Sequence, residues 1–340
     1  MAVRFCPHCN MLLRVKKTDY GLILFCPNCG FRGVMKSEGT IIIQDEIEGS
    51  FEDRVRVLGE CFAALGFDVF RRFDMNEPEF KALEVISKSE DEGTLYCIGI
   101  CSGINDYQLG PGGADRYWSE LLDVYSSYKR IGNDENKLYR FMISFLERPV
   151  SARLRKNKIK RLRRLFDSGF ISRMLKNYDR YIDNPFSVWL ELARALNNPL
   201  KRKTVVFSMK VFDLIHLMLK GKYLDFPEDI PIPVDFHIRN VAISSGIVDE
   251  NASDDEVRRA WMNVLREVNK CISPKINLLR IDSVVWQVGK IMYENNFDRN
   301  RVRKELVKLF VYEIGANEKA SLNLIDNLIL NVDRLKHKSW

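Results

Sequence analysis

The sequence predicts a mainly α-helical protein with a small cysteine-rich β module at its amino terminus. Apolar residues recur at helical spacing through the later part of the chain, as at Val57 and Cys61, and Pro, Gly and Asn separate the apolar segments. Two Cys-x-x-Cys pairs precede this region. We therefore expect a module at residues 1–38, a linker at 39–52 and an all-α domain of about ten helices at 53–340.

The amino-terminal module carries the motifs Cys6-Pro-His-Cys9 and Cys26-Pro-Asn-Cys29, which sixteen residues separate. Two turns at this spacing can present four thiolates to one Zn²⁺ ion, and because no position remains for a water, the ion would be structural. His8 is left outside this ligand set. Paired disulfides or a redox Cys-x-x-Cys are the alternatives, which an intracellular chain without a βαβ pattern disfavours. The other cysteines are expected to be core thiols: Cys61, Cys97, Cys101 and Cys271.

The helical domain is predicted from segments that each combine an apolar stripe with a polar face. Only within the module do short strands with apolar residues suggest a β structure. A short helix is also expected directly after Asp235. The longer helices are expected at 51–66, 114–130, 136–149, 184–196, 202–221, 253–271, 280–295 and 300–315.

Composition limits the classes of function. The apolar fraction of 46% is that of a globular protein, and the net charge of +7 favours a polyanionic partner. No apolar run reaches the roughly 18 residues of a membrane span, and the first residues contain Cys, Arg and Lys instead of a signal-peptide core. We expect no membrane association and a cytoplasmic location.

The strongest charge cluster is the segment RLRKNKIKRLRR at residues 153–164, which holds eight cations and no acidic residue in twelve positions. It can be a solvated helix face. It can also contact phosphates, in which case binding releases counterions and depends on salt. The second interpretation supports a nucleic-acid partner without sequence specificity.

Lys203 is the candidate nucleophile, because it follows the turn at 196–200 and begins a predicted helix. The helix dipole and partial burial would both favour the neutral amine, the form that attacks an electrophilic carbon. Lys210 is the rival, two helical turns along the same face. Asp235 is the candidate carboxylate partner, although a helix N-cap is its ordinary role and both roles can coexist. Asp213 is a weaker rival, expected to be an exposed helix charge.

Three segments carry a family resemblance: KTVVFSMKVFDLIHLM from Lys203, PEDIPIPVDFHIRNVAISSGIV around Asp235, and LLRIDSVVWQVGK from Leu278. Over about residues 53–340 the chain resembles the archaeal GO glycosylases, helix-hairpin-helix DNA glycosylase/lyases that remove 8-oxoguanine. The resemblance implies a two-lobed helical fold, a Schiff-base lysine at Lys203, a catalytic aspartate at Asp235 and an archaeal, nucleoid-associated protein. The words FCPHCNMLLRV and FCPNCGF also resemble the zinc ribbons of archaeal transcription proteins, which implies zinc but not transcription.

The same resemblance implies a base-binding pocket. Phe207 and Trp286 match positions that stack on the two faces of a flipped base, and Asp282 matches a position that hydrogen-bonds its edge. Trp118 and Lys210 match further pocket positions. A core or surface role is the alternative for each aromatic residue.

Two positions depart from that pattern. The family's glutamine in a D-P-Q-Y segment is replaced by Glu79, and a carboxylate cannot donate a hydrogen bond unless it is protonated. The hairpin before the lysine, usually L-P-G-V-G in the wider superfamily, reads Leu196-Asn-Asn-Pro-Leu200. Lesion preference is thus open, while the lysine chemistry is not affected.

The expected function is a bifunctional glycosylase and AP lyase that excises an oxidised purine from damaged DNA, with structural Zn²⁺ as its only cofactor. One alternative is a zinc-ribbon nucleic-acid-binding protein on an inactive glycosylase fold. Another is a glycosylase for a different damaged base, suggested by Glu79. The ribbon could also contact a protein partner.

Overall fold

The computed structural model describes residues 13–18, 21–25, 32–35, 41–42 and 51–336. The chain divides into two compact units, the first ending at Asp53 and the second beginning at Arg54. The four cysteines of the predicted zinc site lie outside the described residues.

Unit 1 contains a four-stranded antiparallel meander of order β1-β2-β3-β4. Its register pairs Arg14 with Phe25 and Ile23 with Val34. The last strand lies inside the segment that the sequence predicts to be a linker, and it pairs with the third. The strands are β1 (Arg14–Thr18), β2 (Gly21–Phe25), β3 (Arg32–Met35) and β4 (Ile41–Ile42).

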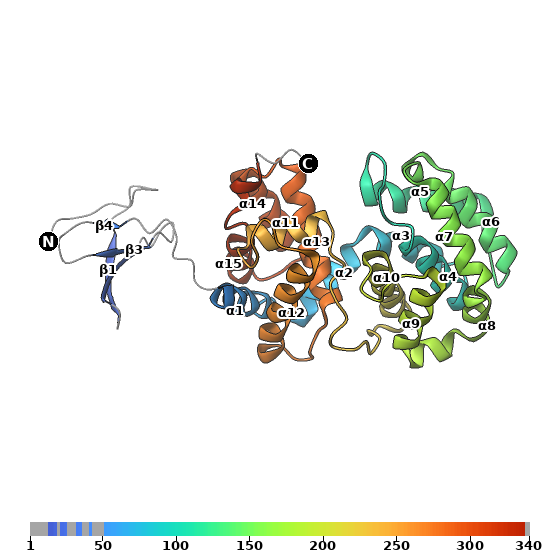
Figure 1. Cartoon of the computed structure of the whole chain (residues 1–340), viewed down its shortest axis with the longest axis horizontal. Coiled ribbons are helices and arrows are strands. Elements are labelled where there is room, and N and C mark those ends of the chain that lie inside the picture. Colours follow the sequence, from blue (N-terminus) through green and yellow to red (C-terminus); the bar gives the residue numbers. More distant parts are fainter. Residues whose placement is uncertain (1–12, 19–20, 26–31, 36–40, 43–50, 337–340) are drawn as a thin grey trace. The chain divides into compact units, whose positions relative to one another are not determined.

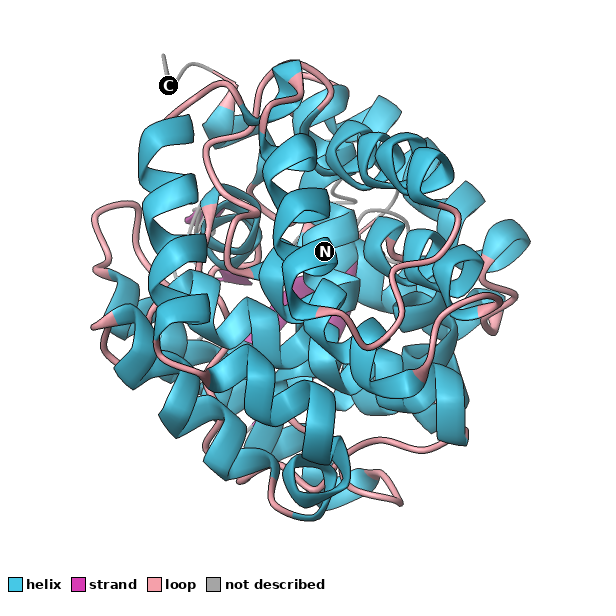
Figure 2. Cartoon of the chain, turned by 90° about the vertical axis from the view of Figure 1, so that its right-hand side faces the viewer, coloured by secondary structure: helices cyan, strands magenta, loops and turns pink. Residues whose placement is uncertain are grey.

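The described part of unit 2 is helical, with short loops between helices (Figure 2). It contains more helices than the ten expected. They are α1 (Phe51–Ala63), α2 (Phe67–Asn76), α3 (Pro78–Ser87), α4 (Glu92–Gly103), α5 (Gly113–Tyr128), α6 (Glu135–Leu146), α7 (Arg155–Asp167), α8 (Phe170–Asp183), α9 (Pro185–Leu196), α10 (Lys203–Lys220), α11 (Phe236–Ser244), α12 (Asp254–Cys271), α13 (Leu278–Glu294), α14 (Arg299–Val307) and α15 (Glu318–Leu328), with short helical turns η1 (Pro149–Ser151), η2 (Lys308–Glu313) and η3 (Val332–Leu335).

Many of these helices begin at a side chain that satisfies the first free backbone amides. Ser253 and Glu256 form a capping box at the start of α12, because each side chain bonds the backbone amide of the other residue. Aspartate or asparagine caps the following helices through a side-chain oxygen: α4, α6, α9, α11, α13, α14 and α15.

The described part of unit 2 has two large hydrophobic cores and therefore two lobes (Figure 1). We call them lobe A and lobe B. Lobe A packs α1, α2 and α11–α15 around residues such as Trp261 and Phe310. Lobe B packs α3–α10 around residues such as Tyr117 and Phe145. The described part of unit 2 therefore has the two-lobed helical fold that the family resemblance implies.

A buried charge network joins the lobes. The Arg280 guanidinium of α13 pairs with Asp74 of α2 and, at 3.0 Å, with Asp213 of α10. It also lies over the Tyr223 ring, 4.1 Å from the centroid. Asp213 is fully buried, so the expectation of an exposed helix charge is wrong. Breaking such a pair would leave an uncompensated buried charge, so this network holds the lobes in register.

The four cysteines of unit 2 differ in exposure. Cys61, Cys97 and Cys101 are buried thiols, but Cys271 is exposed and is not the core thiol that the sequence predicts. Within the described residues, none of the helices is long and apolar enough to cross a membrane.

Candidate active site

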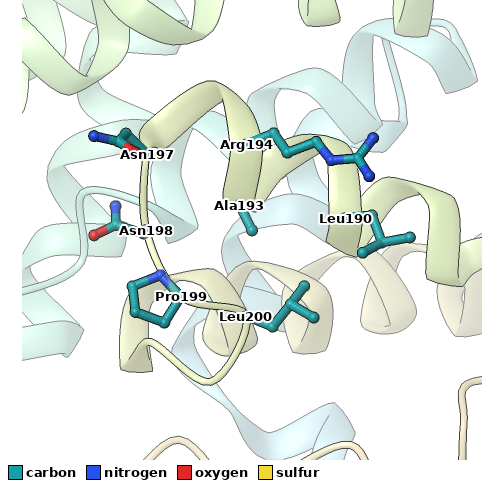
Figure 3. A pocket seen from close by; sticks show the side chains of 7 residues that line it. All are labelled: Leu190, Ala193, Arg194, Asn197, Asn198, Pro199 and Leu200. Atoms are coloured by element: carbon teal, nitrogen blue, oxygen red, sulfur yellow. The ribbon is translucent and has the colours of Figure 1, made fainter.

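Lys203 is the first residue of α10, and a tight turn from α9 places it there. Asn197 ends α9 in the left-handed region with φ 51°, where asparagine is tolerated better than most residues. The Asn198 amide then donates to Ala193 O at 2.9 Å, and the Trp189 indole donates to Leu200 O at 2.9 Å. The turn lines a surface pocket whose residues Figure 3 shows: Leu190, Ala193, Arg194, Asn197, Asn198, Pro199 and Leu200.

Asp235 approaches Lys203 from lobe A. Its Oδ1 accepts the Ile238 amide at 3.0 Å and so caps α11, while its Oδ2 lies 3.3 Å from Lys203 Nζ. The N-cap role and the role of ion-pair partner therefore coexist. The lysine side chain keeps 33% of its surface exposed and the aspartate 14%, so the pair lies at the edge of the protein interior.

The electrostatics of this pair differ from the sequence expectation. Burial lowers the pKa of Lys203, but the charges of Asp235 and Asp106 raise it by more, so the net pKa is above the ordinary lysine value. The expectation of a lowered lysine pKa is wrong. Burial raises the pKa of Asp235, yet Lys203 and His237 bring it below the ordinary value. The resting pair is an ammonium and a carboxylate.

Lys210, the rival nucleophile, lies at the centre of a buried carboxylate cluster. Its Nζ is 2.7 Å from Asp282, 3.2 Å from Glu77 and 3.7 Å from Glu79. The side chain is only 1% exposed. Burial lowers the pKa of Lys210, but the three carboxylates raise it well above the ordinary value. Lys203 is also protonated and paired, but it faces one carboxylate and keeps 33% of its side chain exposed, whereas Lys210 is enclosed by three carboxylates, so Lys203 is the better candidate.

Three carboxylates around one ammonium cannot all be ionised without cost. Burial raises the pKa of Glu79 to about 7 against the attraction of Lys210, and it raises the pKa of Glu77 and of Asp282 as well. Within the described part of the chain, Oε1 of Glu79 and Oδ1 of Asp282 are buried without a hydrogen-bond partner. The cluster thus holds a proton near neutral pH and offers two unsatisfied oxygens.

The aromatic candidates occupy different environments. Phe207 is half-buried one turn after Lys203, and its ring centroid is 5.9 Å from Lys210 Nζ. Trp286 is half-buried on α13, one turn after Asp282, with the His237 ring edge-on at 5.7 Å. Trp118 is instead 1% exposed in the core of lobe B. The structure brings Phe207 to the cluster and does not place Trp118 on a surface.

Sequence reasoning missed three titratable residues, two near the Lys203–Asp235 pair and one in the Lys210 cluster. Asp106 interacts electrostatically with Lys203 and Asp235. His237 is half-buried beside Asp235, and Glu77 belongs to the Lys210 cluster. For Asp106 the sequence offers one signal: a charged residue directly follows the apolar segment that ends at Ile104.

The basic segment 153–164 forms α7 and divides into two faces. On the inner face, Arg161 donates to Thr204 Oγ1 at 2.7 Å, directly beside Lys203 in sequence, and Lys158 is fully buried. On the outer face four cations are exposed: Lys156, Lys160, Arg163 and Arg164. Arg153, just before the helix, is also exposed. Among the described residues, no group of His, Cys, Asp or Glu could hold a metal ion.

Lys203 and Asp235 thus meet between two helical lobes, at the start of the second helix of the α9–turn–α10 unit. Residues 59–321 match the family AGOG: N-glycosylase/DNA lyase, and the chain belongs to this family. It is an N-glycosylase/DNA lyase of the archaeal type.

Similar proteins agree with this assignment. An N-glycosylase/DNA lyase of Thermococcus kodakarensis is 28% identical over 242 residues, covering 70% of this chain and 84% of the relative. One of Methanococcus maripaludis is 27% identical over 263 residues, covering 74% and 95%. The solved structure of an 8-oxoguanine DNA glycosylase from Pyrobaculum aerophilum, complexed with 8-oxoguanosine, matches with a TM-score of 0.60 and 18% identity over 81% of this chain and 96% of that one. This last likeness establishes the fold.

Proposed function

We propose that this enzyme excises an oxidised purine, in the first place 8-oxoguanine, from DNA and then cuts the strand by β-elimination. Lys203 attacks the anomeric carbon, and the Schiff base that follows divides one difficult step into easier ones. The observation that carries the proposal is the 3.3 Å separation of Lys203 Nζ and Asp235 Oδ2 at a partly exposed position, while Lys210 is buried and fully paired.

Asp235 is proposed to stabilise positive charge on the sugar. Because its pKa lies below the ordinary value, it stays ionised while the glycosidic bond breaks and the sugar becomes oxocarbenium-like. Its N-cap bond to Ile238 holds the carboxylate in place. Phe207 and Trp286 are proposed to stack on the flipped base, and Asp282, Glu79 and Lys210 to contact its edge.

Glu79 is proposed to act as a donor in spite of being a carboxylate. Its pKa of about 7 means that it carries a proton below neutral pH and loses it above. A protonated acid offers one donor and one acceptor, as a glutamine amide does. Glu79 can therefore replace the family's glutamine as a hydrogen-bond donor to the lesion at pH values where it is protonated.

Excision of a panel of damaged bases by the wild-type protein tests the substrate. Binding of an 8-oxoguanine duplex at different pH values tests the donor role of Glu79. In a Lys203→Gln background, the affinity for an 8-oxoguanine duplex should fall about ten-fold between pH 6 and pH 8, the equivalent of one buried hydrogen bond. The variant Glu79→Gln should remove this pH dependence, and Glu84→Gln, an exposed change on the same helix, should retain it.

The outcomes separate the alternatives. Preferred excision of another lesion by the wild-type protein would keep the enzyme and change its substrate. Binding without any excision or borohydride-trapped adduct would favour an inactive binding protein. An affinity that is flat with pH in the Lys203→Gln background would contradict the donor role of Glu79.

We also propose that Cys6, Cys9, Cys26 and Cys29 bind one structural Zn²⁺. The described strands support this, because the pairing of Arg14 with Phe25 means that the chain enters β1 and leaves β2 at the same end. The purified protein should contain about one zinc per chain by mass spectrometry, following from four thiolates per ion. Cys26→Ser should lose it and the exposed Cys271→Ser should not; zinc retained in both, or absent from the wild type, would contradict the site.

A DNA substrate also bears on the basic helix α7 and on the location of the enzyme. The exposed face of α7 is proposed to contact DNA phosphates, which its four exposed cations and Arg153 just before the helix support. We propose that the enzyme works at the nucleoid in the cytoplasm, where its DNA lies. Contact of the amino-terminal module with a protein partner is also a proposal.

A further inference from the structure

One face of α13 leads from the buried carboxylate cluster to solvent. Four of its side chains follow one another at intervals of three or four residues and so share this face: Asp282, Trp286, Lys290 and Tyr293. Asp282 is 2% exposed, Trp286 is half-buried and Tyr293 is 54% exposed. Tyr293 follows Trp286 by two helical turns, a rise of about 10 Å. This stripe therefore connects the proposed base-stacking position with the surface of lobe A.

The Tyr293 ring is held by other aromatic rings of lobe A. The Phe236 and Phe297 rings meet it edge-on, with centroids 5.5 Å and 6.4 Å away. The His237 ring is edge-on to Tyr293 at 6.1 Å and to Trp286 at 5.7 Å. These contacts restrict the ring while more than half of the residue stays exposed. An exposed ring that is already ordered loses little conformational entropy when a ligand stacks on it.

The first turn of α11 fixes His237 against the stripe. A Cβ on Gly289 would lie 2.7 Å from His237 Cβ and 2.8 Å from His237 O, closer than real contacts allow, so α11 packs directly on α13 here. The same turn begins at Asp235, whose carboxylate caps α11 and pairs with Lys203. The surroundings of Tyr293 are thus tied to the turn that positions the candidate catalytic carboxylate.

The charges beside the stripe favour an uncharged ligand. Lys290 Nζ lies 5.8 Å from the Trp286 ring centroid. It pairs with Asp115 of α5 in lobe B at 2.5 Å and with Glu294 at 4.0 Å. Two carboxylates against one ammonium do not attract a phosphate. The surface around Tyr293 therefore suits the flat, uncharged ring of a nucleobase better than the DNA backbone.

We infer that Tyr293 stacks on the nucleobase next to the lesion in the same strand, while the lesion itself lies against Trp286. The inference rests on the proposed function, which places the flipped base at Trp286. A flipped nucleotide stays joined to its neighbours, so its entry draws the adjacent nucleotide towards the exposed end of the stripe. An aromatic ring there replaces part of the stacking that flipping removes. Because every base has a π face, the contact is independent of sequence.

Two ligands of different size separate this surface from the base pocket. In a Lys203→Gln background, the nucleoside 8-oxoguanosine fills only the pocket, whereas a single-stranded 8-oxoguanine oligonucleotide also presents the adjacent base. Tyr293→Ala should weaken oligonucleotide binding about ten-fold, as expected for the loss of one base–aromatic stack, and leave nucleoside binding unchanged. Tyr293→Phe should bind both ligands as the parent does. So should the control Tyr312→Ala, which removes a 78% exposed tyrosine on η2 of the same lobe.

2-Aminopurine beside the lesion, placed on each side in turn, gives a second readout, because its fluorescence falls when it stacks on an aromatic ring. Binding should quench it on one side in the parent and not in Tyr293→Ala. Equal weakening of nucleoside and oligonucleotide binding would show that the ring only supports the pocket, and unchanged binding of both would show no contact. Either result overturns the inference alone. A wild-type protein that excises no lesion and forms no adduct on an abasic duplex overturns the proposed function, and the inference with it.

Discussion

Lys203→Gln should abolish both base excision and the borohydride-trapped adduct on a lesion-containing duplex. Removal of a covalent nucleophile costs on the order of 10⁴-fold or more in rate, because no other group can form the intermediate. The only other lysine proposed as a nucleophile, Lys210, is paired with three carboxylates and is 1% exposed. It cannot substitute for the missing amine without breaking that cluster.

The matched control is Lys201→Gln, two residues earlier in the chain. Lys201 is exposed and pairs with Asp255 at 2.8 Å, so its loss should change the rate little. Lys203→Gln should fold normally, since the Asp235 cap on Ile238 does not depend on the lysine. Lesion binding by the variant should persist. An adduct that forms in Lys203→Gln and is absent from Lys210→Gln would move the nucleophile to Lys210.

The sequence predicts those helices that have one apolar and one polar face. Residues 253–271, predicted as helical, correspond to α12 at Asp254–Cys271. By contrast α4 leaves no periodic signal, because every residue from Gly93 to Gly103 is buried and no polar face remains to alternate with an apolar one. Pro78 begins α3 and separates it from α2, and the sequence analysis predicts neither of these two short helices.

The candidate site was predictable where its residues are local in sequence. Lys203 and Asp235 lie at helix starts that the turn at 196–200 and the prolines before Asp235 indicate. The environment of Asp213 was not predictable, since its partner Arg280 is 67 positions away. The raised pKa of Lys203 depends in part on Asp106, which lies on a loop of another helix pair. The pKa values of these groups depend on charged residues that are distant in the sequence, and a single sequence does not show which of them come into contact.

Lys210→Met should be the most destabilising substitution near the site. The change keeps much of the apolar stem but leaves Glu77, Glu79 and Asp282 buried without their ammonium. Removing one partner of a buried ion pair costs about 3–5 kcal/mol. Thermal or urea unfolding should show this loss. The control is Lys220→Met, also on α10, which breaks a solvent-accessible ion pair with Glu92 of α4 and should cost under about 1 kcal/mol.

The loss should also depend on pH in a defined direction. Without Lys210 the folded-state pKa values of the three carboxylates rise further above their unfolded values, because burial already raises the pKa of Glu77, Glu79 and Asp282. The folded state then binds more protons than the unfolded one, so stability falls as pH rises through this range. Lys210→Met should therefore be closer to the wild type near pH 5 than near pH 8. Adding Asp282→Asn should recover part of the stability at pH 8; an equal loss at both pH values would show that the ammonium does not compensate the carboxylates.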